Sequence, residues 1–160
     1  MTKERFMEQI DALQGMLYRI ALSILRNNAD VQDALQETVL KAWEKQYTLR
    51  NEAYFGTWVT RIAINVCKQM LRQKKRIVLM DELPETPATS DGITLKMLME
   101  CLPEKLRLPF VLQYAEGMDT AEVADTLHLT QSAVRSRIHR AKLILRKELA
   151  HHDEETMASR

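Results

Sequence analysis

The 160-residue chain has little of what β-hairpins need. It contains only four glycines and four prolines, which leaves few candidate tight turns. Helix-forming residues dominate, and no segment alternates apolar and polar residues in the manner of a half-buried strand. We therefore predict an all-α protein, built as one medium domain or two small ones.

Cysteine is also scarce, because Cys67 and Cys101 are the only two and stand far apart. They form no Cys-x-x-Cys motif, and no histidine stands at zinc-ligand spacing from either. A reduced, cytoplasmic protein without a disulfide is therefore expected. No apolar run reaches the length of a membrane span, and no secretory signal opens the chain.

The chain lacks the side-chain groupings that a small helical enzyme needs. No nucleophile–base pair and no set of metal ligands stands out. His151 and His152 precede Asp153 in the tail 151–160, which has no apolar anchor and is expected to fray. We therefore expect no enzymatic activity, no bound metal, no cofactor and no small-molecule substrate.

Charge is nearly balanced overall but unevenly distributed. The formal net charge is +1, yet residues 1–76 carry 13 Lys and Arg against 8 Asp and Glu. Residues 77–118 carry 3 against 7. Within them, segment 77–92 is rich in Pro, Ser, Thr and acids and lacks a helical period, so we predict a flexible linker there.

The most informative segment is Asp119–Lys147, which has the pattern of two short helices joined by a tight turn. Asp119 and Glu122 have the spacing of a capping box, and Gly117 can end the preceding helix. The turn is His128-Leu129-Thr130, whose threonine can cap the second helix. This is the pattern of a helix-turn-helix whose second helix enters a DNA groove.

The second of these helices combines an apolar stripe with a basic surface. The stripe predicted to face a core is Val134, Ile138, Ala141 and Leu145. Six Lys and Arg and no acid lie between Ser132 and Lys147, and phosphates attract such a surface. The residues predicted to contact DNA are Ser132, Arg135, Ser136, His139, Arg140 and Lys142. A basic, solvated helix at the end of an ordinary bundle is the alternative interpretation.

A helix from about Asp30 to Lys45, with Asp30 as its predicted cap, carries a second surface. Its predicted apolar side comprises Val31, Ala34, Leu35, Val39, Ala42 and Trp43. The residues left outside are Asp33, Gln36, Glu37 and Lys41. Asp33 and Glu37 are four residues apart on one face, a spacing that could suit a metal ion. However, no histidine and no third carboxylate stands at metal-ligand spacing from them. We therefore reject a metal site, and a solvated or protein-docking face remains.

A third helix is predicted from about Tyr54 to Arg76. Spacings of three and four residues align five of its side chains on one face: Trp58, Arg61, Asn65, Lys68 and Arg72. An aromatic ring among cations suits opened nucleic acid, whose unstacked bases need π-faces and whose phosphates need charge. Trp58 alone fits a core position equally well.

The second half of the chain contains further helix signals. A helical segment begins near Ile93, and Leu102-Pro103-Glu104 has the composition of a helix start. Pro109 lies inside the following apolar run and is expected to bend or break that helix. We predict two small helical domains, 1–76 and 93–150, joined by the linker and followed by the tail.

Several of these pieces occur in the order found in extracytoplasmic-function (ECF) sigma factors, the small bacterial initiation factors of the sigma-70 family. The chain resembles them in five places: Asp30 to Trp43, Thr57 to Asn65, Leu102-Pro103-Glu104, Glu116-Gly117 and Val134 to Arg137. The resemblance implies that RNA polymerase core, promoter DNA and an anti-sigma factor are its partners.

The resemblance also implies a role for each surface. The helix from Asp30 docks on the clamp coiled coil of the polymerase β′ subunit through Asp33, Gln36, Glu37 and Lys41. The helix carrying Trp58 to Arg72 helps to open the −10 element and captures flipped nontemplate bases. Within it, Asn65 corresponds to a residue of the family's base-reading loop. The segment Ser132–Lys142 reads the −35 element in the major groove.

Regulation is expected to come from outside the chain, which shows no long amino-terminal extension and no added carboxy-terminal domain. A membrane-bound anti-sigma factor would tether an otherwise cytoplasmic protein, which we expect to be a monomer outside its complexes. In the linker, Asp81, Glu82 and Glu85 are hypothesised to mimic nucleic acid near the polymerase channel.

The alternative is a conventional helix-turn-helix regulator with a helical effector domain, which usually dimerises. It explains Asp119–Lys147 but leaves the other two surfaces without a purpose.

Overall fold

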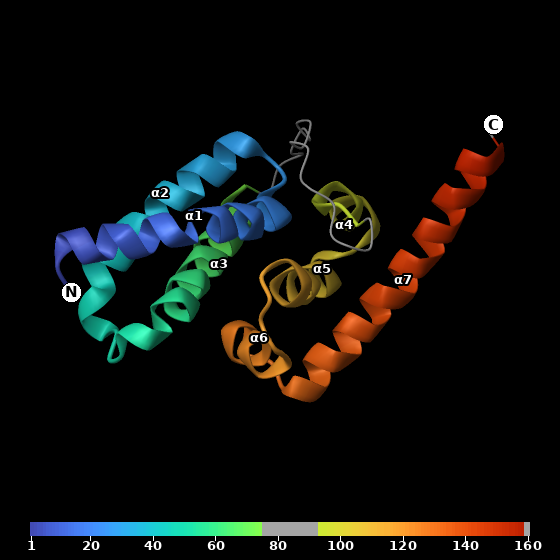
Figure 1. Ribbon diagram of the computed structural model, residues 1–160. Coiled ribbons are helices and arrows are strands. Elements are labelled where there is room, and N and C mark those ends of the chain that lie inside the picture. The colour runs from blue at the N-terminus through green and yellow to red at the C-terminus, as the bar shows by residue number, and fades with distance from the viewer. Residues whose placement is uncertain (75–92, 159–160) are drawn as a thin grey trace. The chain divides into compact units, whose positions relative to one another are not determined.

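The computed structural model describes residues 1–74 and 93–158, and its regular elements in these ranges are all helical. They form two compact units, which divide within segment 75–92 (Figure 1). The prediction of an all-α chain with two helical units is confirmed. The predicted linker, with Asp81, Glu82 and Glu85, lies outside the described residues.

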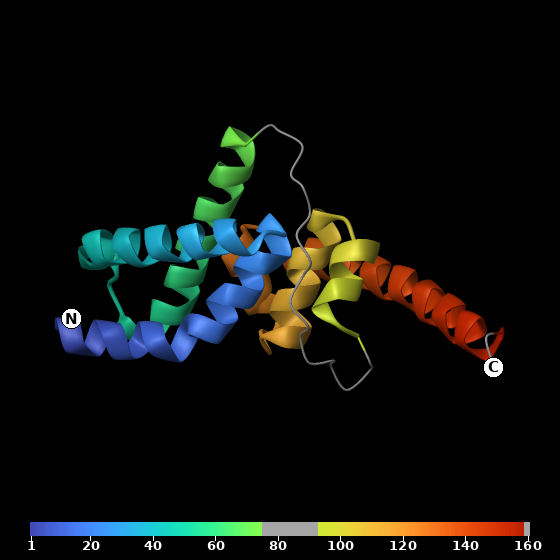
Figure 2. The ribbon, with the colours of Figure 1, turned by 90° about the horizontal axis from the view of Figure 1, so that it is seen from above.

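The first unit consists of three helices, α1 (Lys3–Leu25), α2 (Asn28–Lys45) and α3 (Phe55–Gln73). Each helix packs against the other two, and α3 crosses the α1–α2 pair (Figures 1 and 2). Two short 3-10 turns, η1 (Gln46–Thr48) and η2 (Glu52–Tyr54), occupy the connector between α2 and α3.

An aromatic cluster joins the three helices at the end of the unit nearest this connector. The Phe6 side chain of α1 is 1 % exposed. Its ring meets Trp43 of α2 at 5.1 Å and Phe55 of α3 at 5.7 Å between centroids, edge-on in both cases. The surrounding core contains Ile10, Leu17, Ala42, Val59 and Ala63. The two residues that Phe6 contacts therefore bracket the connector.

The start of α2 differs from the prediction. Asn27 is the N-cap, and its side-chain oxygen accepts the backbone N–H of Asp30 at 3.1 Å. Asp30 is buried in the first turn, where a negative charge favours the helix dipole. Its carboxylate pairs with the ammonium of Lys74, the residue that ends α3. The predicted Asp30 cap is therefore wrong, and Asp30 links two helices instead.

The second unit contains α4 (Leu95–Cys101), α5 (Glu104–Phe110), the π-helical turn η3 (Val111–Ala115), α6 (Thr120–Leu127) and α7 (Gln131–Ala158). All four preceding elements reach α7 directly or through a neighbour. The core residues they share are Ile93, Leu98, Leu102, Phe110, Val111, Ala141 and Leu145. The long α7 is therefore the element on which this unit is assembled.

Two residues of α5 set the local geometry before the helix-turn-helix. Arg107 is buried, and its guanidinium donates to the Leu102 carbonyl at 3.0 Å, which secures the end of α4. Pro109 lacks an N–H for the α-helical ladder, and α-helical bonding stops one residue later, where η3 begins. The helical path therefore continues through Pro109 and changes its bonding pattern after Phe110, and the predicted bend or break at Pro109 stays a prediction.

The helix-turn-helix forms as the sequence predicted. The Asp119 carboxylate accepts the N–H of Glu122 at 2.8 Å, and the Glu122 carboxylate accepts the N–H of Asp119 at 2.8 Å. His128 ends α6 in the left-handed conformation, with φ of 56°. The Thr130 hydroxyl accepts the N–H of Ala133 at 3.1 Å. The capping box, the turn and the second cap are therefore confirmed.

The end of the chain departs from the predicted frayed tail. Helix α7 continues to Ala158, and its last turns extend beyond the other helices of its unit (Figures 1 and 2). No glycine or proline follows Gly117, so the sequence contains no strong helix terminator in this region. Residues 151–158 are therefore helical rather than frayed.

Candidate nucleic-acid and protein interfaces

Helix α7 presents two distinct polar surfaces. Its apolar stripe, Val134, Ile138, Ala141 and Leu145, is buried as predicted. The residues Ser132, Ser136, His139 and Arg140 are exposed on the side away from this stripe. Arg135 and Lys142 lie on the flank that borders α6 and η3. The six predicted DNA-contacting side chains are therefore accessible, but they do not all point in one direction.

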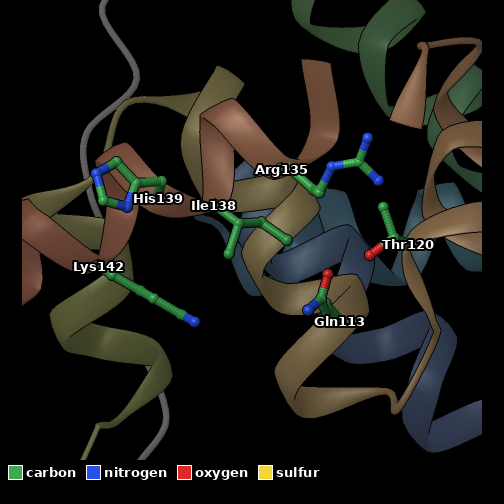
Figure 3. A pocket seen from close by; sticks show the side chains of 6 residues that line it. All are labelled: Gln113, Thr120, Arg135, Ile138, His139 and Lys142. Carbon is green, nitrogen blue, oxygen red and sulfur yellow. The ribbon is translucent and has the colours of Figure 1, made fainter. Parts of the chain in front are cut away.

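The flank of α7 borders a shallow hollow of about 170 Å³. Arg135, Ile138, His139 and Lys142 line it from α7, and Gln113 and Thr120 line it from the opposite side (Figure 3). Gln113 belongs to the π-turn η3, and Thr120 is the first residue of α6. Sequence reasoning missed both residues, since only the fold brings them beside α7.

Helix α3 carries the predicted cationic face. Asn65, Lys68 and Arg72 are exposed, whereas Trp58 and Arg61 are half-buried. The Trp58 ring lies 6.0 Å from that of Phe55 and packs against the core, so part of it serves the fold. Asn65 lies inside helix α3, where the helix predicted from about Tyr54 to Arg76 placed it.

The connector between α2 and α3 exposes two aromatic rings that sequence reasoning missed. The side chains of Tyr47 and Tyr54 are 83 % and 64 % exposed. The connector is tied to α1 by an ion pair in which Arg5 meets Glu52 at 2.8 Å. The sequence pattern that could have indicated them is a pair of tyrosines just before a cationic helix, because π-faces and cations together suit unstacked bases.

The outer face of α2 is acidic and accessible, as the sequence predicted. Asp33, Gln36 and Glu37 are exposed, and Lys41 pairs with Glu37 at 3.4 Å, one helical turn away. The same face carries Leu40, whose side chain is 54 % exposed. Sequence reasoning missed Leu40, although its position seven residues after Asp33 places it on this face.

Metal and membrane chemistry find no support in residues 1–74 and 93–158. No group of three or more His, Cys, Asp or Glu side chains in these ranges could hold a metal ion. No helix within the same ranges is long and apolar enough to cross a bilayer.

Cys67 and Cys101 are both free, and the buried Cys67 should be inert in the folded protein. Burial raises the pKa of the Cys67 thiol from 9.0 to about 12, so almost none of it is thiolate at pH 8. In a Cys101→Ser variant we expect no reaction with Ellman's reagent at pH 8 until denaturant is added. Rapid stoichiometric labelling of that native variant would contradict this.

The raised pKa of Cys67 also determines how the free energy of unfolding changes at alkaline pH. Between pH 9 and about 12 the unfolded thiol loses its proton while the buried Cys67 thiol keeps it. The unfolded state then binds fewer protons, so the contribution of Cys67 to the free energy of unfolding falls as the pH rises.

Comparisons with known proteins match both units of the chain. A family model described as Sigma-70 region 2 matches residues 9–77, and one described as Sigma-70, region 4 matches residues 93–145. The chain is 32 % identical over 158 residues to the ECF RNA polymerase sigma factor SigE of Mycolicibacterium smegmatis, covering 89 % of this chain. It spans only 61 % of the length of that relative.

Two further matches cover most of this chain and most of the matched protein. The chain is 30 % identical to the RNA polymerase sigma-E factor of Streptomyces coelicolor, covering 92 % of this chain and 88 % of that relative. The solved sigma factor RpoE, in complex with the anti-sigma factor NepR from Bartonella quintana, has the same fold. Its TM-score is 0.77 at 21 % identity, covering 92 % of this chain and 98 % of that one.

Proposed function

The chain belongs to the ECF sigma factors of the sigma-70 family, and from that premise we propose that it directs promoter-specific transcription initiation. It binds RNA polymerase core, reads the −35 element as duplex DNA and captures the opened −10 element. It performs no covalent chemistry and is not an enzyme. The observation that carries the proposal is the presence of three separate accessible polar faces on one chain, on α2, α3 and α7. A conventional regulator needs only the last of these.

The acidic face of α2 is the proposed docking surface for polymerase. Asp33, Gln36 and Glu37 offer carboxylate and amide groups to a basic partner, with Lys41 at the edge. Leu40 adds an apolar contact at the centre of the same face. An apolar centre rimmed by charge fits a partner helix, for which the family points to the β′ clamp coiled coil.

The face of α3 and the neighbouring connector form the proposed surface for the opened −10 strand. Lys68 and Arg72 attract its phosphates, and Asn65 offers an amide for hydrogen bonding. The exposed rings of Tyr47 and Tyr54 provide stacking platforms for unpaired bases. Trp58 and Arg61, half-buried at the start of this face, complete it from the core side.

The exposed side of α7 is the proposed −35 reader. Arg140 can make a bidentate contact with guanine, while Ser132, Ser136 and His139 offer single hydrogen bonds. Arg135 and Lys142 add positive charge on the flank. The domains we propose are therefore a polymerase and −10 domain, 1–76, and a −35 domain, 93–150.

Regulation by an anti-sigma factor is part of the proposal. A solved sigma factor with the same fold is in complex with the anti-sigma factor NepR, and CnrH, which shares the fold, is in complex with the cytosolic domain of CnrY. A protein of this kind would cover the polymerase-binding and DNA-binding surfaces of the chain in the off state. We place the free protein in the cytoplasm, as a monomer, with tethering at the membrane where its anti-sigma factor is membrane-bound.

Run-off transcription with purified core polymerase tests the proposed function. We expect the chain to direct discrete transcripts from some fragments of a genomic library, each depending on both core and this protein. Core alone is the control for background initiation. If no fragment yields a transcript that depends on the added protein, the sigma-factor function fails.

A further inference from the structure

The end of α3 that carries its exposed cations has no buried anchor. The buried side chains of this helix end at Cys67, and none of residues 68–74 is buried. The two apolar side chains in that stretch are only half-buried. Segments with few buried apolar contacts open locally at a low cost in free energy. Lys68 and Arg72, the cations proposed to attract strand phosphates, therefore need another contact to hold them in place.

Lys74 makes such a contact with α2. Its backbone N–H donates to the Met70 carbonyl at 3.0 Å and ends α3. Its ammonium pairs with the carboxylate of Asp30, 44 residues earlier in the chain. The Asp30 side chain is 11 % exposed and that of Lys74 is 49 % exposed. The acid is therefore fixed inside the unit, and the lysine reaches it from the surface.

Asp30 is available for this pair because its neighbour caps the helix. The side-chain oxygen of Asn27 accepts the Asp30 N–H at 3.1 Å, so the Asp30 carboxylate is not used as the cap of α2. The dipole of α2 favours a negative charge in its first turn. A buried charge without a partner is costly, whereas an exposed ion pair contributes little. The carboxylate should therefore hold Lys74 more firmly than a surface acid would.

The ion pair joins α2 and α3 at the ends that lie away from their connector. Near the connector, Phe6 contacts both Trp43 of α2 and Phe55 of α3. Asp30 and Lys74 lie at the start of α2 and the end of α3. The two helices are thus held at both ends, by the aromatic cluster at one and by the ion pair at the other.

We propose that Lys74 is a positioning residue for capture of the opened −10 strand. By binding Asp30 it holds the last turns of α3, so that Arg72 meets a phosphate of that strand. The inference rests on the proposed function and adds two residues to it. It also separates two acids of α2. The buried Asp30 serves the strand surface, whereas Asp33, exposed three residues later, belongs to the docking surface for polymerase.

A direct contact between Lys74 and a phosphate is the competing explanation, and the sign of one substitution separates the two. Asp30→Asn removes a negative charge from the protein and releases the Lys74 ammonium. If Lys74 binds phosphate itself, affinity for the strand should rise, because more positive charge is available to it. If Lys74 acts through Asp30, that affinity should fall although the protein has become more positive.

The test compares holoenzyme binding to two forms of a promoter recovered by run-off transcription. One form has a single-stranded nontemplate −10 segment, and the other lacks that segment. The ratio of the two affinities isolates strand capture. Asp30→Asn and Lys74→Met should each lower this ratio roughly tenfold, as for one lost contact to a charged group. Lys74→Arg keeps the pair and should behave like wild type.

A matched control lies at the other end of α2. Glu44→Gln removes an exposed acid of the same helix that contributes to none of the proposed surfaces, and it should leave the ratio unchanged. Affinity for core polymerase and the urea midpoint are measured in parallel for every variant. Core affinity should stay at the wild-type value in Asp30→Asn and Lys74→Met, because the exposed acids of α2 are intact in both.

Two further readouts distinguish positioning from a purely structural role. The slope of the log ratio against log salt should fall by about 0.7 in Asp30→Asn and in Lys74→Met, as for one lost single-strand phosphate contact. In an Arg72→Gln background Lys74→Met should add little, because the contact that it positions is already absent. A general loss of stability would instead lower core affinity and add fully to Arg72→Gln.

The outcomes separate this inference from the function on which it rests. A ratio in Asp30→Asn equal to or above the wild-type ratio would overturn the inference. Core affinity that falls in step with the ratio, or full additivity with Arg72→Gln, would overturn it as well. A wild-type holoenzyme that shows no preference for the promoter carrying the single strand would instead count against strand capture itself.

Discussion

Replacing Phe6 with alanine is expected to lower the free energy of unfolding of the first unit by about 3–5 kcal/mol. The ring is almost fully buried and contacts both Trp43 of α2 and Phe55 of α3. Its removal leaves a cavity where all three helices meet, and two edge-on aromatic contacts are lost with it. A loss of this size is comparable with the whole stability of many small domains.

Urea denaturation followed by tryptophan fluorescence measures this loss. Both tryptophans of the chain, Trp43 and Trp58, lie in the first unit, so their signal reports that unit alone. Met7→Ala is the matched control, since Met7 neighbours Phe6 in sequence but its side chain is 42 % exposed. Its expected cost is about 0.5 kcal/mol or less. Equal midpoints for the two variants would show that Phe6 does not join the helices.

The second unit could be predicted in detail because its signals are local. The caps at Asp119 and Thr130 and the buried stripe of α7 involve residues within one or two helical turns of each other. At such separations, side-chain chemistry and helical period decide the outcome without knowledge of the fold. The change of bonding after Pro109 is likewise local, because its missing N–H acts on its own helix.

The features that escaped prediction depend on distant partners. Asn27 and Asp30 are both good caps by residue type, and the carboxylate of Asp30 is instead engaged by Lys74, 44 residues away. Leu40 is the exception, because it is apolar by residue type while the helical period alone places it on the exposed face with Asp33. Gln113 and Thr120 lie beside α7 because the packing of η3 and α6 against the rest of the unit brings them there, which no local pattern encodes.

Reversing one charge on α2 should abolish function while leaving the fold intact. In Glu37→Lys a cation replaces an exposed acid at the proposed docking surface for polymerase. A like charge facing a basic partner costs several kcal/mol, so core affinity should fall by roughly a hundredfold or more. The ion pair lost with Lys41 contributes only about 0.3–0.5 kcal/mol to the helix, so the urea midpoint should hardly move.

The double variant Glu37→Lys with Lys41→Glu separates docking from helix stability. It restores an ion pair one turn apart with the charges exchanged, so folding should match wild type while core binding remains weak. Glu8→Lys, the same reversal at an exposed position on α1, is the matched control and should bind core normally. Affinity for core is measured directly, for example by fluorescence anisotropy of the labelled chain, and separately from promoter binding. Wild-type core affinity in Glu37→Lys would remove α2 as the docking surface and leave its acidic face merely solvated.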